Sequence, residues 1–150
     1  MEASNKLASQ GRINQNASLR DKQAVIVNAG IDKIWEILID FSKWNEWNDQ
    51  IKPVKIDKVE EGAQFVLKLN GSTIKSSIQK ISKPELLTWT GVNKGLKSIH
   101  IWRLEETDGN QTIVTTEESM QGFFTIFAGH RKLHETLVYW LNKLKEEAEK

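Results

Sequence analysis

In the last part of the chain, hydrophobic residues recur at steps of three or four. Side chains at this spacing lie along one face of an α-helix, and the opposite face here is charged. The pattern predicts a helix over about 123–150 that buries one side against the rest of the molecule. Its apolar face consists of Leu133, Leu137, Leu141, Leu144 and Ala148, widened by Val138 and Trp140.

From about residue 54 to residue 120, apolar positions alternate with polar ones. A period of two is typical of β-strands whose side chains point in turn to the core and to solvent. Asn70-Gly71 and Asp108-Gly109-Asn110 lie between such segments and predict tight hairpin turns. The expected strands span 54–59, 65–69, 74–79, 87–89, 98–107 and 113–120.

The first third of the chain changes pattern several times. Residues 1–12 are polar and predict a disordered leader, and residues 13–22 predict an extended arm along the surface. The β-branched run 23–28 predicts a strand. Two short helical segments follow, over about 31–39 and 40–48.

The order of these elements predicts an α+β fold. A strand and two short helices precede a series of strands joined by tight turns, and tight turns connect antiparallel neighbours. The helices then pack on one face of the sheet. The length fits one domain, which we expect to span residues 13–150 after the leader.

Composition limits the classes of function. The formal net charge of the 150-residue chain is +1, so no excess of basic charge favours nucleic acid as a partner. The chain has no cysteine, which excludes disulfides and thiolate chemistry. It has neither an apolar run of the ~20 residues that a membrane span needs nor a signal-peptide pattern. We expect a cytoplasmic protein that is a monomer or a weak homodimer.

Three stretches carry a resemblance to a known superfamily. They are VNAGIDKIWEILIDFSKWNEWN at 27–48, ISKPELLTWTG at 81–91 and IHIWRLEETDGNQTIVTTEESMQG at 99–122. They resemble the START-like, or SRPBCC, superfamily, and most of all its polyketide cyclase/dehydrase-like members. The matching positions are Trp35, Trp44, Trp47, Asn48, Pro84, Leu87, Trp89, Gly91, His100, Trp102, Gly109, Thr112, Val114 and Glu118.

This resemblance implies a helix-grip fold and an internal cavity. In that fold a curved antiparallel sheet, here of about six to seven strands, wraps around the long C-terminal helix, and two short helices follow the first strand. The cavity of such proteins lies between the sheet and the helix. Members bind hydrophobic small molecules such as lipids and polyketides, and some catalyse reactions with a few pocket residues and no cofactor.

Alternation along the strands, with its phase set by the inward tryptophan of the family's hairpin, selects the residues expected to face the cavity. The large aromatic residues among them either fill the core or wall the cavity and stack on a planar ligand. Phe123 and Phe127 either form a lip at the entrance or anchor the start of the helix. The predicted ligand-binding residues are Trp35, Trp47, Phe65, Leu67, Ser76, Ile78, Trp89, His100, Trp102, Thr116, Glu118, Phe123, Phe127, His130 and His134.

His100 and Glu118 are the candidate catalytic residues, because they fall on neighbouring predicted strands. A carboxylate beside an imidazole can orient the ring and raise its basicity, as a general acid/base pair requires. The alternative is a buried polar pair whose members satisfy each other and have a structural role.

His130 and His134 stand four residues apart on the long predicted helix, a spacing that can chelate a metal. The run HRKLH lacks the glutamate of an HExxH motif, and the chain has no cysteine, so we predict no metal site. We expect one of the two imidazoles to line the cavity and the other to lie at its rim.

The sequence favours a protein that binds a hydrophobic small molecule, of lipid or polyketide and aromatic type, in the internal cavity. One alternative is a cyclase/dehydrase-like enzyme that uses His100 and Glu118 as acid and base without a cofactor. A second is a protein-interaction module whose surface is the Phe123–Phe127 region.

Overall fold

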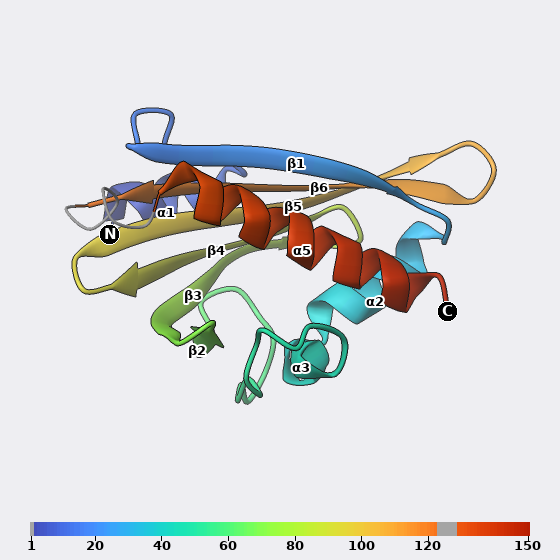
Figure 1. Ribbon diagram of the computed structural model, residues 1–150, viewed down its shortest axis with the longest axis horizontal. Coiled ribbons are helices and arrows are strands. Elements are labelled where there is room, and N and C mark those ends of the chain that lie inside the picture. Colours follow the sequence, from blue (N-terminus) through green and yellow to red (C-terminus); the bar gives the residue numbers. More distant parts are fainter. Residues whose placement is uncertain (1, 123–128) are drawn as a thin grey trace.

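The computed structural model of the chain describes residues 2–122 and 129–150. Figure 1 shows a long helix lying across one face of a sheet, with short helices beside its C-terminal end. In chain order the elements are α1 (Glu2–Ser9), β1 (Leu19–Val27), α2 (Ile31–Ile39), the 3₁₀ helix η1 (Phe41–Lys43), α3 (Trp44–Trp47), β2 (Gln64–Leu69), β3 (Ser72–Ser82), β4 (Leu86–Asn93), β5 (Leu96–Thr107), β6 (Gln111–Gln121) and α5 (His130–Ala148).

The sheet is antiparallel throughout, with the strand order β1-β6-β5-β4-β3-β2. Strands β2 to β6 follow one another as a meander, and β1 closes the sheet by pairing with β6. The predicted fold class is confirmed, because a curved six-stranded sheet carries the C-terminal helix and short helices follow the first strand.

The predicted hairpin turns lie where the sequence places them. Asn70 and Gly71, which join β2 to β3, have φ angles of 48° and 84°. Positive φ at both central residues is the requirement of a type I′ turn, and Asn-Gly meets it at low cost. Lys94 and Gly95 repeat this geometry between β4 and β5, with φ angles of 48° and 82°.

The apolar face of α5 packs on the sheet as the periodicity predicts. Leu137 and Leu144 are fully buried, and Leu133 and Leu141 are each 3% exposed. The helix begins at His130, later than the predicted start near residue 123, and residues 123–128 lie outside the described part of the chain. The C-terminal end of α5 is tied to β1 and the residue after it, because Lys145 Nζ donates to the Ile26 carbonyl and Glu149 accepts from the Asn28 N–H.

The prediction of a disordered leader over residues 1–12 is wrong, because Glu2–Ser9 form helix α1 on the outer face of the sheet. Ala8 is fully buried there, and together with Ile13 it covers Ile99 and Ile101 of β5. This small cluster is separate from the main core. The extended arm expected at 13–22 partly joins the sheet, since β1 begins at Leu19.

Hydrogen bonds hold α1 in place. Thr88 Oγ1 donates to the Ala8 carbonyl over 2.8 Å, and Thr90 Oγ1 donates to Asn5 Oδ1 over the same distance. Because both threonines lie on the outer face of β4, α1 buries polar side chains that alternation alone would assign to solvent.

The predicted strand over 54–59 is wrong. Residues 52–59 lie in no strand, and the segment before them makes only an isolated antiparallel bridge, between Ile51 and Leu69. This segment instead packs Val54 into the core beside the edge strand β2. Alternating sequence is a weak signal where the chain runs along a sheet edge without continuous pairing.

Aromatic rings fill the space between the sheet and the C-terminal half of α5. Phe41 and Trp44 stack with ring centroids 4.2 Å apart, and Trp44 meets Trp140 edge to face at 5.6 Å. Trp102 meets Trp140 at 5.5 Å. Such pairs each add about 0.5–1.5 kcal/mol beyond the burial of their area. The wide core at this end of the molecule is therefore packed with rings.

Candidate functional site

A cavity of about 330 Å³ lies at the other end of the space between the sheet and α5. Most of its lining is apolar, and Trp89, His100 and Trp140 separate it from the aromatic core. The lining residues are Leu67, Leu69, Asn70, Ser72, Ile74, Trp89, Asn93, Lys94, Leu96, Ser98, His100, Glu118, Met120, Lys132, Leu133, Thr136 and Trp140.

Next to the cavity, three neighbouring strands carry small residues in one row. Ser76 of β3 is opposite Gly91 of β4, and Gly91 is opposite Ser98 of β5. A Cβ atom on Gly91 would lie 2.5 Å from Ile74 Cγ2 and 2.9 Å from Ser98 Oγ. Large side chains resume in the next row, at Ile78, Trp89 and His100. Of the small row, Ser98 lines the cavity, and Ile74 packs into the space that Gly91 leaves.

His100 lies at the inner end of the cavity among three indole rings. Its ring centroid is 4.6 Å from that of Trp89, 5.1 Å from Trp140 and 5.6 Å from Trp102. Its side chain is 3% exposed. The surroundings of this imidazole are therefore almost entirely apolar.

Two polar groups contact the His100 ring. Nε2 lies 2.7 Å from Thr116 Oγ1, a hydrogen-bond distance. Nδ1 lies 3.7 Å from Glu118 Oε1, which is too long for a hydrogen bond but within the range of an ion pair. The Glu118 side chain is 10% exposed and lines the cavity, so its carboxyl group is the more accessible of the two titratable groups.

Burial moves both pKa values towards the neutral forms. It lowers the pKa of His100 to about 3 and raises the pKa of Glu118 to about 8. Indole faces attract an imidazolium by about 0.5–2 kcal/mol, but a shift of several pKa units at ~1.4 kcal/mol each outweighs that attraction. At neutral pH the site therefore holds a neutral imidazole and a protonated carboxyl group.

This arrangement gives the inner end of the cavity one hydrogen-bond donor and one hydrogen-bond acceptor, neither of which is charged at neutral pH. A carboxylic acid whose pKa lies near neutral pH is suited to general acid catalysis, and it can also donate a hydrogen bond to a bound oxygen atom. The imidazole nitrogen that carries no proton can accept a hydrogen bond.

The structure brings four of the predicted site residues into the cavity lining, namely Leu67, Trp89, His100 and Glu118. Thr116 reaches the cavity only through its hydrogen bond to His100. The other predicted side chains on the sheet and α2–α3 lie in the core or beside Gly91, and two of them, Phe65 and Ser76, also line a separate hollow at β2–β4. We correct the prediction that they face the cavity. They are Trp35, Trp47, Phe65, Ser76, Ile78 and Trp102.

The prediction that His130 and His134 face the cavity or its rim is wrong. Their side chains are 62% and 47% exposed and point to β1, where His134 Nδ1 lies 3.1 Å from Asp21 Oδ2. Asp21 also accepts from the Gln23 side chain. The stripe of α5 that faces the sheet passes through Leu133 and Leu137, so positions 130 and 134 fall at its edge. Phe123 and Phe127 lie outside the described residues.

The predicted site residues do not include most of the polar lining. Asn93 and Lys94 belong to the β4–β5 hairpin, and Lys132 and Thr136 belong to the first turns of α5. Their polar side chains are of the types that usually face solvent, so the sequence alone did not select them. Lys132 directly precedes Leu133, which the periodicity places on the face of the helix that packs on the sheet. This neighbourhood is the sequence signal that could have indicated Lys132 as a lining residue.

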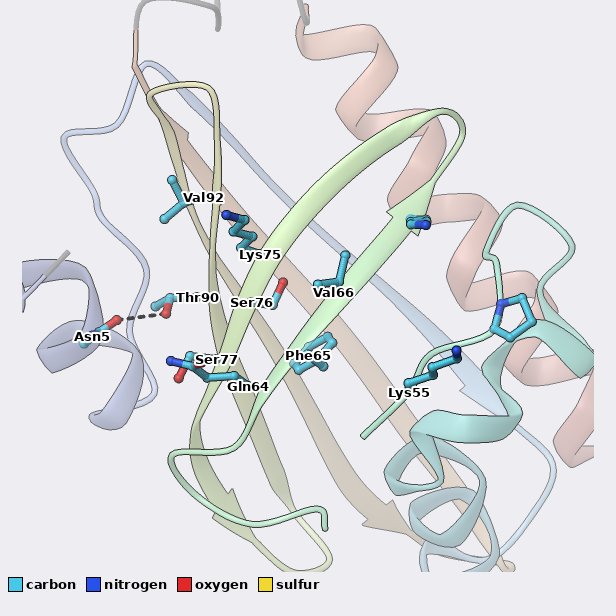
Figure 2. A pocket seen from close by; sticks show the side chains of 12 residues that line it. Asn5, Lys55, Gln64, Phe65, Val66, Lys75, Ser76, Ser77, Thr90 and Val92 are labelled. Atoms are coloured by element: carbon cyan, nitrogen blue, oxygen red, sulfur yellow. Dashed lines mark hydrogen bonds between the residues drawn. The ribbon is translucent and has the colours of Figure 1, made fainter. Parts of the chain in front are cut away.

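Two larger hollows, of about 710 and 680 Å³, lie on the surface. Figure 2 shows residues that line the first, which lies at β2–β4 beside α1, with the hydrogen bond from Thr90 to Asn5 drawn between β4 and α1. Eight of its twelve lining residues are polar, among them Lys55, Lys68 and Lys75. The second lies beside α5, around Arg131 and Tyr139. Neither contains His100 or Glu118.

A family model described as polyketide cyclase/dehydrase and lipid transport matches residues 20–149. The chain belongs to this family. The resemblance seen in the sequence is thereby confirmed. The matched region includes the cavity, His100 and Glu118, and the α1 helix precedes it.

Solved structures of the same fold include a START superfamily protein from Mycobacterium smegmatis, with a TM-score of 0.75 and 15% identity over 87% of this chain and 97% of that chain. A hypothetical protein from Helicobacter pylori has a TM-score of 0.74 and 18% identity over 87% of this chain and 86% of that chain. The Zhui aromatase/cyclase from Streptomyces sp. R1128 has a TM-score of 0.66 and 16% identity over 87% of this chain and 93% of that chain. At these identities the comparisons show a shared fold. No curated protein matches the chain.

Among residues 2–122 and 129–150, no helix is long and apolar enough to cross a membrane. Within the same residues, no group of three or more histidine, aspartate or glutamate side chains is placed to hold a metal ion.

Proposed function

We propose that this protein binds a small hydrophobic molecule in the cavity between β2–β6 and the first turns of α5. The observation that carries the proposal is a cavity lined by five aliphatic side chains, one methionine, two indole rings and one buried titratable pair. Ligand sites are typically apolar hollows with a few convergent polar groups.

The volume sets the size of the ligand. At ~30 Å³ for each water-sized group, about 330 Å³ accommodates roughly eleven such groups. This is the size of a bicyclic aromatic molecule or a medium-chain aliphatic one. Trp89 and Trp140 supply flat surfaces on which an aromatic ligand can pack.

Calorimetric titration with β-naphthol tests the proposal, because this neutral bicyclic phenol fits the volume. We expect one binding site per chain. The affinity for β-naphthol should fall at least tenfold in Ser98→Leu, because the larger side chain fills part of the cavity. Ser77→Leu makes the same change on the outer face of β3 and serves as the control. The proposal is contradicted if β-naphthol does not bind, or if the two variants bind it equally.

A second candidate function is acid/base catalysis of a dehydration, and it is favoured by the raised pKa of Glu118 beside a neutral imidazole. In a β-hydroxy ketone, the Glu118 carboxyl group would protonate the departing hydroxyl while His100 takes the proton from the carbon next to the ketone. The C–O and C–H bonds break, a C=C bond forms and water leaves. The released water relays the proton from the His100 imidazolium to the Glu118 carboxylate, which lie 3.7 Å apart, and this restores both groups.

The aldol of benzaldehyde and acetone is a suitable substrate, since its dehydration to benzalacetone is followed by ultraviolet absorbance. We expect acceleration over buffer, and a loss of about 100-fold or more in Glu118→Gln, the usual contribution of a general acid. Retained binding of β-naphthol by Glu118→Gln would separate catalysis from binding. A rate equal to that in buffer would eliminate this candidate.

A further inference from the structure

Two exposed lysines line the cavity, one from the sheet and one from the helix, and we take their side of the cavity as its mouth. Lys94 lies in the tight turn of the β4–β5 hairpin, and Lys132 lies in the first turn of α5. Figure 1 shows this hairpin and the start of α5 at the same end of the molecule. Both side chains are exposed, yet both line the cavity.

Within the described residues, neither ammonium group has an acidic partner. The neighbouring Glu135 is bound by Arg131, with 3.1 Å between Nε and Oε1, so it does not neutralise Lys132. Glu118 is the one acidic side chain in the cavity lining, and it lies at the inner end beside His100. The cavity is therefore positive at its mouth and uncharged at its inner end.

The inner end of the cavity disfavours a charged ligand group but offers hydrogen bonds to an uncharged polar one. Its titratable groups are buried among indole rings, and a charged ligand group there would have to lose its water without an opposite charge to meet. An uncharged hydroxyl or carbonyl oxygen avoids this cost. It can hydrogen-bond with the Glu118 carboxyl group, which has no hydrogen-bond partner within the described residues.

We propose that the cavity selects an amphipathic monoanion of about a dozen non-hydrogen atoms. Its carboxylate lies at the mouth between Lys94 and Lys132, and its buried end carries an uncharged hydroxyl or carbonyl group facing Glu118. This inference rests on the proposed binding function and specifies the class of ligand.

p-Coumarate is the probe, since it has a carboxylate at one end and a neutral phenol at the other. We expect it to bind at least about tenfold more tightly than its methyl ester, because each exposed lysine supplies a modest attraction that salt screens. Raising the salt concentration should weaken binding of the acid and leave the ester unchanged. p-Carboxycinnamate, which has a second carboxylate at the inner end, should bind at least tenfold more weakly than p-coumarate.

Paired lysine variants locate the effect. Lys94→Gln with Lys132→Gln should lose about tenfold in affinity for p-coumarate and less than twofold for the ester. Lys75→Gln with Lys97→Gln removes the same charge from exposed lysines that do not line this cavity, and should change neither affinity.

The outcomes separate this inference from the proposed function. If β-naphthol and the ester bind but the acid gains nothing over the ester, the preference for an anion is wrong while the binding function survives. The same conclusion follows if both paired variants lose affinity equally. If the acid, the ester and β-naphthol all fail to bind, both proposals are overturned.

Discussion

Burial determines the protonation of the two titratable groups in the cavity, and its effect on stability depends on pH. Between about pH 4.5 and 8 the unfolded chain ionises Glu118 while the folded chain keeps it protonated, so this group lowers the free energy of unfolding as pH rises. His100 acts in the opposite sense. Between about pH 6.5 and 3 the unfolded chain binds a proton that the folded chain does not, so stability falls as pH falls.

These opposing effects predict one pH range in which the contribution of Glu118 to stability can be measured alone. From about pH 4.5 to 6.5 the two contributions cancel, and from about pH 6.5 to 8 only Glu118 acts. The wild-type chain should lose about 2 kcal/mol across the upper window, or about 4–8 °C in Tm. Glu118→Gln should show a flatter profile there, measured by thermal unfolding at a series of pH values. Parallel profiles for the two chains would mean that Glu118 is ionised in the folded state.

We predict that the fold requires glycine at position 91, because a larger residue would clash with its neighbours. Gly91→Ala places a Cβ within 2.5 Å of Ile74 Cγ2, and a methyl group attached directly to a β-branched Cβ has little freedom to move away. We expect a loss of about 1–3 kcal/mol in the free energy of unfolding, the usual cost of overpacking. Affinity for β-naphthol should fall in parallel. Thr73→Ala, on the exposed outer face of the neighbouring strand, should change neither quantity.

At the level of elements, α1 covers what would otherwise be an apolar patch on the outer face of the sheet. Without it, Ile99 and Ile101 would lose their cover, and Thr88 and Thr90 would lose their hydrogen bonds to the helix. The family match begins after this helix, so α1 is an addition to the matched fold in this chain.

A charge at the buried position of α1 tests this role. Ala8→Glu should lower the free energy of unfolding by roughly 2–5 kcal/mol, because it places an unpaired carboxylate against Ile99 and Ile101 or detaches the helix. Ala3→Glu makes the same change at an exposed position of the same helix and should cost little. Chemical denaturation measures both, and equal stability of the two variants would show that α1 is not packed on the sheet.

The elements that the sequence predicts well are those whose signal is local. Periodicity identifies α5, and Asn70-Gly71 identifies its hairpin turn. The α1 helix has no such signal, since its stability comes from the outer face of β4 and β5, far away in sequence. The histidines of α5 were misplaced because a periodic stripe defines a face but not its edges, and His130 and His134 fall at the edge that meets Asp21.

At the level of the whole molecule, the space beneath α5 is divided into a packed half and a hollow half. Trp44, Trp102 and Phe41 fill the half near α2 and α3, and the cavity occupies the half near the hairpin ends. The sequence could predict which residues point inward but not where this division falls. The small residues Ser76, Gly91 and Ser98 fall side by side next to the hollow half, and that row follows only from the register of three strands.

The central claim is that this hollow half is the ligand site. Intermolecular NOEs between β-naphthol and the methyl groups of the protein test it most directly. The structure predicts NOEs to Leu67, Ile74 and Leu133, which line the cavity, and none to Val66 or Ile26, which are exposed elsewhere. NOEs confined to Val66 or Ile26, or no NOEs to the three lining residues at saturating ligand, would contradict the claim.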